Sequence, residues 1–193
     1  MNQVIENIYS RHSVRSYRDE PVPRELLDQV LEAGRRAPSG GNNQCSRIYV
    51  ISNKDVLARM SRLAEAEFAK MEVYEGMYKS LRSSIVRSKN GGYDFTYNAP
   101  VNIIVTNKKG YGNAMADSAM LLMTMMLAAQ SLGLGTCYTN QTHWLDENEA
   151  FRSFLSELGV KDDETVCCGM SIGWPENPGK EVQRVGNEVV FIE

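Results

Sequence analysis

The segment over residues 113–132 restricts the fold more than any other, because it is apolar almost all the way round the helix that its composition favours. Its central run, residues 119–129, is shorter than the roughly 20 apolar residues that a membrane-spanning helix needs. Asp117 and Gln130 flank this run. We therefore expect a helix buried at the centre of the fold. Its five methionines are more typical of a core than of a binding surface, and they are Met115, Met120, Met123, Met125 and Met126.

The length of 193 residues suits one α/β domain with a substantial core, so we expect a single domain over residues 1–193. Apolar residues make up 42% of the chain and charged residues 23%, as in ordinary soluble globular proteins. The net charge of -3 gives no reason to expect binding to nucleic acid or to an acidic membrane surface. The first residues are already amphipathic and do not resemble a signal peptide.

The cysteines and histidines do not form a metal-binding or disulfide pattern, because neither C-x-x-C spacing nor zinc-site spacing is present. A reduced, cytoplasmic protein without a metal is the simplest interpretation. Two histidines also define no Ser-His-Asp set, and the absence of G-x-G-x-x-G after a strand argues against a Rossmann dinucleotide site. The residues concerned are Cys45, Cys137, Cys167, Cys168, His12 and His143.

Hydrophobic periodicity and turn residues divide the chain into helices and strands. Helices are predicted at residues 2–10, from 21 to before 38, 54–87 with a break near 73–76, 113–132 and 146–158. Strands are predicted at residues 47–52, 101–106, 137–139 and 165–173. The second of these is nearly continuous β-branched sequence, which is typical of a central strand covered on both faces. A last β-like segment, residues 188–192, has no hairpin partner beside it, so it is expected to pair at a distance or with another subunit.

A basic motif over residues 11–15 follows the first predicted helix. Arginine presents a planar fork of donors that matches phosphate oxygens, and serine adds a compact donor. In an extended segment Arg11, Ser13 and Arg15 project to the same side, because side chains alternate along the chain. The motif is a plausible clamp for a phosphorylated cofactor, although the pentapeptide alone is more typical of a solvated basic turn.

A loop rich in glycine and amide side chains spans residues 38–44. Glycine permits close approach of the backbone to a flat ligand, and Asn or Gln can bind a polar ring edge. On its own, however, this loop is an ordinary Gly/Asn turn.

Taken together, five segments in order closely resemble the nitroreductase family of FMN-dependent oxidoreductases, and the resemblance covers nearly the whole chain. They are Arg11-His12-Ser13-Val14-Arg15, Pro38-Ser39-Gly40-Gly41-Asn42-Asn43-Gln44, Ala99-Pro100 before a strand, the long helix into Gly133-Leu134-Gly135-Thr136, and Gly173-Trp174-Pro175 before a basic tail. Each is weak alone, but five in order within one domain make coincidence improbable. The resemblance implies an α+β sandwich, with helices packed round a mixed central sheet, in an intertwined homodimer. It also implies two FMN molecules, each bound in a groove at the dimer interface.

The resemblance further implies that four sets of residues bind the cofactor. The set that holds the ribityl phosphate and the flavin pyrimidine edge is Arg11, Ser13 and Arg15, with His12 beside it. The set that comes from the other subunit is Pro38, Ser39 and Gly40, with Asn42 and Gln44 nearby. The set beside the isoalloxazine is Gly135 and Thr136. The phosphate site would be completed by Lys180 or Arg184.

The implied reaction is ping-pong: NADH or NADPH delivers hydride to the flavin N5 atom and leaves, and a nitroaromatic, quinone or similar acceptor takes its place. A positive group near the flavin N1–O2 edge would stabilise the anionic reduced flavin, and Arg15 is the candidate. No catalytic residue is assigned, because water can protonate the product. Three alternatives stay open: a carrier or sensor that binds FMN without turnover, an interaction domain without flavin, and the flavin-fragmenting or dehalogenating branches of the family.

Two parts of the chain depart from the family pattern. Cys45 and Ser46 stand where the family usually has proline and an aromatic residue, so the loop that borders the cofactor should differ in shape. Cys45 is more typical of an incidental cysteine than of a reactive thiol. Residues 65–95, which usually shape the substrate mouth and supply a further flavin contact, match least.

Overall fold

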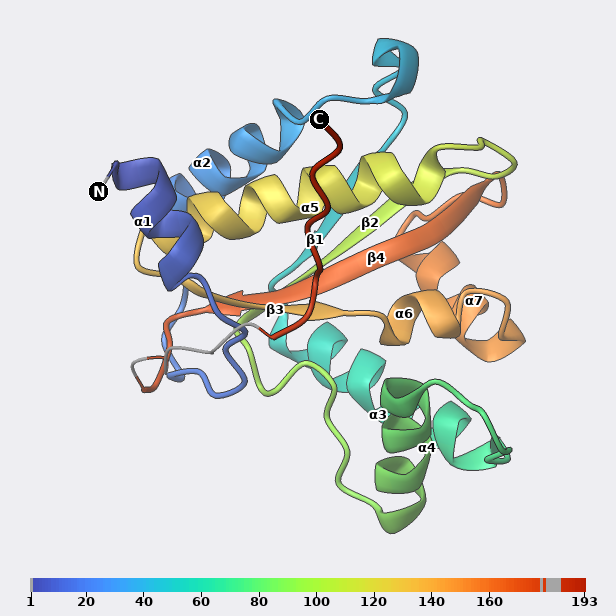
Figure 1. Cartoon of the computed structure of the whole chain (residues 1–193). Coiled ribbons are helices and arrows are strands. Elements are labelled where there is room, and N and C mark those ends of the chain that lie inside the picture. The colour runs from blue at the N-terminus through green and yellow to red at the C-terminus, as the bar shows by residue number, and fades with distance from the viewer. Residues whose placement is uncertain (1, 178, 180–184) are drawn as a thin grey trace.

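A four-stranded sheet forms the middle of the computed structural model, which describes residues 2–177, 179 and 185–193. The strands lie in the order β1 (Arg47–Ile51), β2 (Val101–Lys108), β4 (Glu164–Gly173) and β3 (Gly135–Thr139), as Figure 1 shows. All three ladders between these strands are antiparallel, and the parallel pairing in the described part of the chain is an isolated bridge between Ser13 and Thr136. Every residue of β2 except Lys108 is buried, as predicted for a central strand.

Helices α5 (Ala114–Ser131) and α2 (Arg24–Arg35) cover one face of the sheet, and α1 (Gln3–Ser10) packs against α5 (Figure 1). Val101 and Ile103 of β2 join Leu122 of α5 in the core on this side, because alternate residues of a strand face the same layer. Gly34 lets α2 approach α5 closely, since a Cβ there would lie 2.5 Å from Met125 Cγ.

Helices α3 (Lys54–Lys70), α4 (Lys79–Asn90), α6 (Gln141–Trp144) and α7 (Glu149–Glu157) lie on the other side of the sheet (Figure 1). Ile104 of β2 points to this side and packs in a second core with Phe68, Phe151 and Phe154. The predicted break near residues 73–76 is confirmed, because α3 ends before it and α4 begins after it. Helices on both sides of a sheet confirm the expected α+β class.

Within one chain, α5 is buried on one side rather than all round. Met125 and Met126 belong to the core, as expected. Met115, Met120 and Met123 are between 40% and 46% exposed, so the opposite side of the helix is an apolar surface. The prediction of a fully buried central helix is therefore wrong for the isolated chain.

Three local features differ from the pattern-based expectations. The short helix α6 was not predicted, and α7 begins at Glu149 because Asn148 Oδ1 accepts a hydrogen bond from Phe151 N at 2.9 Å and caps the helix. Residues 188–192 form no strand and lie in an exposed coil at the C-terminus.

None of the helices in the described part of the chain combines the length and hydrophobicity that a membrane crossing requires.

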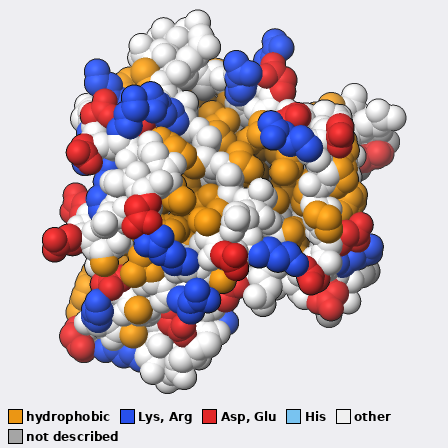
Figure 2. Space-filling model, turned by 180° about the vertical axis from the view of Figure 1, so that it is seen from behind, with side chains coloured by type: hydrophobic (Ala, Val, Ile, Leu, Met, Phe, Trp, Pro, Cys, Tyr) orange, Lys and Arg blue, Asp and Glu red, His pale blue; other side chains and the backbone are white. Residues whose placement is uncertain are grey.

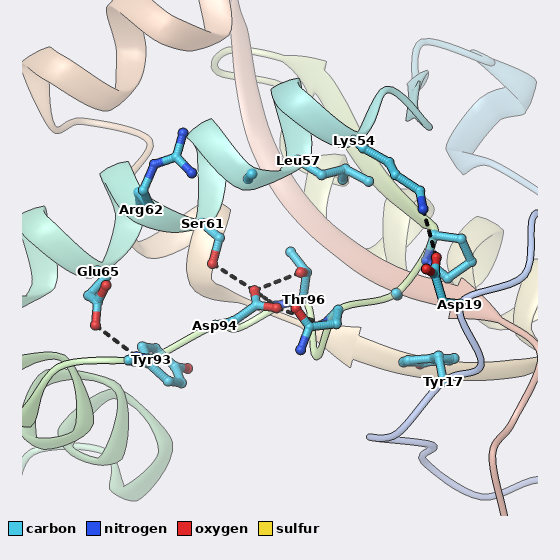
Figure 3. Close-up of a pocket in the computed structure, with 15 residues that line it drawn as sticks. Tyr17, Asp19, Lys54, Leu57, Ser61, Arg62, Glu65, Tyr93, Asp94 and Thr96 are labelled. Atoms are coloured by element: carbon cyan, nitrogen blue, oxygen red, sulfur yellow. Dashed lines mark hydrogen bonds and ion pairs between the residues drawn. The ribbon is translucent and has the colours of Figure 1, made fainter.

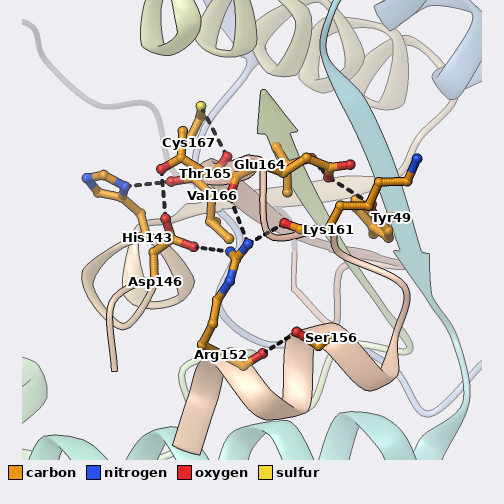
Figure 4. Close-up of polar contacts among 11 residues, drawn as sticks. Tyr49, His143, Asp146, Arg152, Ser156, Lys161, Glu164, Thr165, Val166 and Cys167 are labelled. Atoms are coloured by element: carbon orange, nitrogen blue, oxygen red, sulfur yellow. Dashed lines mark hydrogen bonds and ion pairs between the residues drawn. The ribbon is translucent and has the colours of Figure 1, made fainter. Parts of the chain in front are cut away.

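Arg152 joins α7 to the start of β4 (Figure 4). Its guanidinium donates to Asp146 Oδ1 and to the Glu164 carbonyl oxygen, both at 2.8 Å, and also to the Lys161 carbonyl oxygen. The second oxygen of Asp146 accepts from Thr165 Oγ1 at 2.7 Å. The Asp146 side chain is 8% exposed, so its negative charge depends on these partners.

Replacing Arg152 with Met should lower the free energy of unfolding by about 2–3 kcal/mol, because the buried Asp146 carboxylate loses its cationic partner. Urea denaturation followed by circular dichroism measures this change. Arg24→Met is the matched control, since the exposed Arg24–Asp28 pair should contribute no resolvable stability. Equal effects of the two substitutions would contradict this account of Arg152.

Candidate functional site

The basic motif runs along the outer edge of β3 and is fixed there by backbone pairing. Val14 N donates to the Thr136 carbonyl oxygen at 2.9 Å, next to the parallel bridge of Ser13 with Thr136. Beyond the motif, Tyr17 forms an antiparallel bridge with Pro175, which follows β4. The structure therefore brings the N-terminal motif and the start of β3 together, as the resemblance implies.

Val14 is the most deeply buried residue of the motif. Val14 is 7% exposed and packs against β3, between the half-buried Ser13 and the exposed Arg15. Gly135 makes this packing possible, because a Cβ at that position would lie 2.6 Å from Val14 Cγ2. The apolar residue thus anchors the segment while its polar neighbours stay accessible to a ligand.

His12 lies at the other end of the motif. Its Nδ1 atom is 3.0 Å from the Ser10 carbonyl oxygen. Gly179 packs so tightly on the imidazole that any side chain at this position would overlap it. Lys180 and Arg184, the two predicted phosphate ligands of the basic tail, lie outside the residues that the structure describes.

Arg15 meets two further side chains, Tyr97 and Cys137. The Tyr97 phenol interacts with the Arg15 guanidinium and with the Cys137 thiol. Burial raises the pKa of the Cys137 thiol, although Arg15 and Tyr97 act in the opposite direction. Cys137 is therefore protonated at neutral pH and is not an activated nucleophile. Sequence analysis missed Tyr97, because its only signal was its place two residues before Ala99-Pro100.

The loop over residues 38–44 is held at the N-terminal end of α5. Gly40 N donates to Asp117 Oδ1 at 3.0 Å, and Tyr111 OH donates to Asp117 Oδ2 at 2.9 Å. Asp117 is 3% exposed, so the loop rests on a buried carboxylate. A Cβ on Gly40 would overlap the end of the Asn113 side chain, which would have to move to make room for it. Asp117 and Tyr111 are thus supporting residues that the sequence patterns did not reveal.

The remaining predicted residues of this loop give it its shape. Gln44 N donates to Ser39 Oγ at 3.0 Å, and Gln44 Nε2 donates to Asn42 Oδ1 at the same distance. Asn42 and Gln44 have φ of 55° and 49°, in the left-handed region that side chains other than glycine rarely adopt. Pro38 precedes this turn and is exposed, like Asn42 and Gln44. The amide groups and the neighbouring Cys45 are accessible in the single chain.

One chain keeps the two groups of predicted residues apart. Asp117 anchors the loop near the start of α5, whereas Gln130 Nε2 donates to Ser10 Oγ at 3.2 Å beside the motif near its end. At 1.5 Å per residue, these anchors are about 20 Å apart along the helix. Figure 1 shows the loop and the motif at opposite ends of α5. A single chain therefore does not assemble the complete predicted site.

A separate groove of about 600 Å³ lies between α3 and the segment before β2 (Figure 3). Tyr17, Leu57 and Pro100 supply its apolar surface, and Lys54 and Asp19 form an ion pair at 2.7 Å on its rim. None of the predicted cofactor residues that the structure describes lines this groove.

The nitroreductase family profile matches residues 8–174. This chain belongs to the nitroreductase family. The match covers both the N-terminal motif and the strands on which it rests, so the resemblance inferred from the five segments is confirmed.

Individual relatives agree with this assignment. The chain is 30% identical over 202 residues to a 4-nitrobenzoate reductase of a Nocardioides species, covering 88% of this chain and 79% of the relative. It is 30% identical over 138 residues to an FMN reductase [NAD(P)H] of Bacillus subtilis, covering 70% of this chain and 53% of the relative. A Bacteroides fragilis nitroreductase crystallised with bound FMN has a TM-score of 0.89 to this structure at 30% identity, with 100% of both chains covered.

Replacing Gly135 with Ala should lower the free energy of unfolding by about 1–3 kcal/mol, because the new Cβ overlaps Val14 and pushes the motif away from β3. Chemical denaturation measures the change. Adding Val14→Ala to this variant should restore part of the loss by removing the overlap.

Gly112→Ala is the control for a simple glycine replacement, because no atom lies within 4 Å of the Cβ that it would add. If it destabilises the protein as much as Gly135→Ala does, the close packing of Val14 on Gly135 is not the cause.

Proposed function

We propose that this protein is an FMN-dependent NAD(P)H oxidoreductase that reduces a nitroaromatic, a quinone or a similar acceptor. The observation that carries the proposal is the backbone pairing of Val14 with Thr136, because it places a motif with two arginines beside the strand that begins with Gly135. Family membership and the names of the relatives support the same chemistry.

The donors of this region fit a flavin that carries a phosphate. The guanidiniums of Arg11 and Arg15 and the hydroxyl of Ser13 suit anionic oxygens, and His12 adds a ring nitrogen beside them. In the proposed site Arg11 and Ser13 bind the phosphate end, with Lys180 or Arg184 completing it, and Arg15 binds the pyrimidine edge. The backbone of Gly135 and Thr136 lies beside the ring system.

Bound FMN supplies the redox chemistry, which is hydride transfer from NADH or NADPH and then reduction of the acceptor in a ping-pong sequence. The residues of this chain bind and orient the cofactor, and the positive charge of Arg15 favours electron density at the pyrimidine edge. No side chain is assigned as a general acid or base. The proposal places the enzyme in the cytoplasm, in keeping with its four free cysteines.

We propose further that the site is completed by a second copy of the chain. Pro38, Ser39 and Gly40 of the partner, with its Asn42 and Gln44, would cover the cofactor that the motif holds, since one chain keeps these two groups at opposite ends of α5. The exposed methionines of α5 and the exposed Val4, Ile5 and Ile8 of α1 provide an apolar surface for dimerisation.

A second surface favours an intertwined dimer. Figure 2 views the molecule from behind and shows hydrophobic side chains gathered at the middle of that face, within a rim of charged ones. A groove of about 480 Å³ lies between α2 and the open edge of β1, with Leu31, Ile48 and Val50 among its lining residues. We propose that the partner's C-terminal segment, residues 188–192, pairs along this edge, because Val189, Val190, Phe191 and Ile192 are 72–95% exposed within one chain.

Purified protein should show the visible absorption of bound FMN, and anaerobic NADH or NADPH should bleach it. A nitroaromatic such as 4-nitrobenzoate, or a quinone, should then restore the oxidised spectrum. Flavin bands that persist in the presence of both nucleotides would favour a carrier or sensor. Protein that stays colourless and binds no added FMN would overturn the proposed function.

Chains damaged in different groups should complement each other if the partner completes the site. One chain carries Arg11→Ala and Arg15→Ala, the other carries Gly40→Ala, and differently tagged copies are co-expressed so that the mixed dimer can be purified. One of its two sites is then undamaged, so the mixed dimer should bind about half the FMN of a wild-type dimer. If both groups act within one chain, each site keeps a defect, and FMN content stays as low as in the two parent dimers.

A further inference from the structure

We propose that Tyr97 is a positioning residue that fixes the Arg15 guanidinium at the pyrimidine edge of the flavin. This inference rests on the proposed function, and it concerns a residue outside the motifs on which that function was argued. Three observations carry it: a turn built around Asp94, an unusual backbone conformation at Tyr97, and the contact of its phenol with Arg15.

The turn before β2 is organised by the Asp94 carboxylate. Its Oδ1 atom accepts hydrogen bonds from Thr96 N at 2.8 Å, from Thr96 Oγ1 at 2.6 Å and from Ser61 Oγ of α3 at 2.6 Å. Its Oδ2 atom accepts from Asn98 N at 2.6 Å. Figure 3 shows Ser61 and Thr96 pointing at Asp94 from α3 and from the turn itself. One carboxylate thus holds the residues on both sides of Tyr97 and ties them to a helix.

Tyr97 and Asn98 both adopt left-handed backbone conformations, with φ of 59° and 54°. Such conformations are uncommon for residues other than glycine, and for a bulky residue they are strained. Asn tolerates this region, but Tyr gains nothing from it locally. The surrounding hydrogen bonds therefore hold Tyr97 in a conformation that its own backbone disfavours, which is typical of residues whose side chain must be aimed.

The side chain of Tyr97 leads to the motif. Its ring packs with the small buried cluster of Val14, Tyr17 and Ala99, and its phenol meets Arg15 and Cys137. Although burial acts in the opposite direction, the Cys137 thiol and the phenol interact with the Arg15 guanidinium and favour its charged form, which raises the pKa of Arg15. Tyr97, which lies outside the motif, thereby holds the Arg15 side chain in place.

Holding the Arg15 guanidinium in one position should affect how the protein binds the cofactor. A free arginine side chain loses conformational entropy when ligand binding orders it, so an arginine already held in place binds its ligand more tightly. A fixed positive charge also stabilises the negative charge that the pyrimidine edge gains on reduction. Tyr97 should therefore strengthen binding of FMN and raise its midpoint potential, both through Arg15.

The test combines Tyr97→Phe, Arg15→Ala and the double variant. The dissociation constant for FMN is measured by fluorescence titration of apoprotein, and the midpoint potential by redox titration. Tyr97→Phe should weaken FMN binding about tenfold, because the Arg15 guanidinium loses the polar group that holds it in place. It should also lower the midpoint potential, and a tenfold smaller preference for reduced FMN corresponds to about 30 mV.

The double variant decides whether Tyr97 acts through Arg15. In the Arg15→Ala background, adding Tyr97→Phe should change neither the dissociation constant nor the potential, because the group that Tyr97 positions is gone. Additive effects of the two substitutions would overturn the inference, and so would a Tyr97→Phe protein that matches wild type in both measurements. If wild-type protein binds no FMN, the proposed function fails and the inference fails with it.

Two further variants separate positioning from stability. Tyr49→Phe removes a hydroxyl in the middle of β1 that donates to Glu164 Oε2 at 2.8 Å, and it should leave FMN affinity and potential unchanged. Ser61→Ala removes one hydrogen-bond donor to Asp94 and leaves Tyr97 itself unchanged. It should weaken FMN binding and lower the midpoint potential, as Tyr97→Phe does, but by less. This variant also tests the inference if Tyr97→Phe does not fold, and wild-type behaviour of Ser61→Ala would then contradict it.

Discussion

The pairing of Val14 with Thr136 at the edge of β3 is the interaction on which the proposed site depends. An edge strand offers unpaired backbone groups, and here the N-terminal segment uses them instead of a further strand of the sheet. Gly135 has no side chain, so Val14 can pack closely against β3 while Ser13 and Arg15 stay accessible. Backbone pairing and one small residue thus convert a solvated basic turn into a fixed row of donors.

Local sequence patterns predicted the parts of the fold that local physics decides. The β-branched run of β2 and the apolar stripe of α2 are visible without a structure, because burial on both faces or on one face leaves its own periodicity. The exposed side of α5 was not predictable in this way, since an apolar residue on the surface of a chain looks the same in sequence as one that faces the core. Residues 188–192 met the same difficulty, because their strand-like composition says nothing about where a pairing edge will be found.

In the candidate site, too, some residues could be predicted from the sequence and others could not. The motif and the Gly/Asn loop were recognisable because their residue types bind ligands directly, and the structure brings the motif to Gly135 and Thr136 as expected. The residues that hold these segments were not recognisable. Asp117 holds the loop through Gly40, and Asp94 holds the turn that contains Tyr97. In the sequence neither aspartate differs from a surface carboxylate, because a hydrogen-bond partner of each lies far away in the chain. Supporting residues of this kind are defined by tertiary contacts that span tens of positions in the chain.

The two anchors on α5 also make this helix a spacer of fixed length. Asp117 carries the loop and Gln130 contacts the motif end, so the helix sets both the distance and the rotation between the two groups. Inserting one residue between the anchors would lengthen the spacer by only about 1.5 Å, but it would turn one anchor by about 100° relative to the other. Side chains along the exposed side of α5 can therefore change in size with local consequences, whereas any change in the number of residues would misalign both sites of the proposed dimer at once.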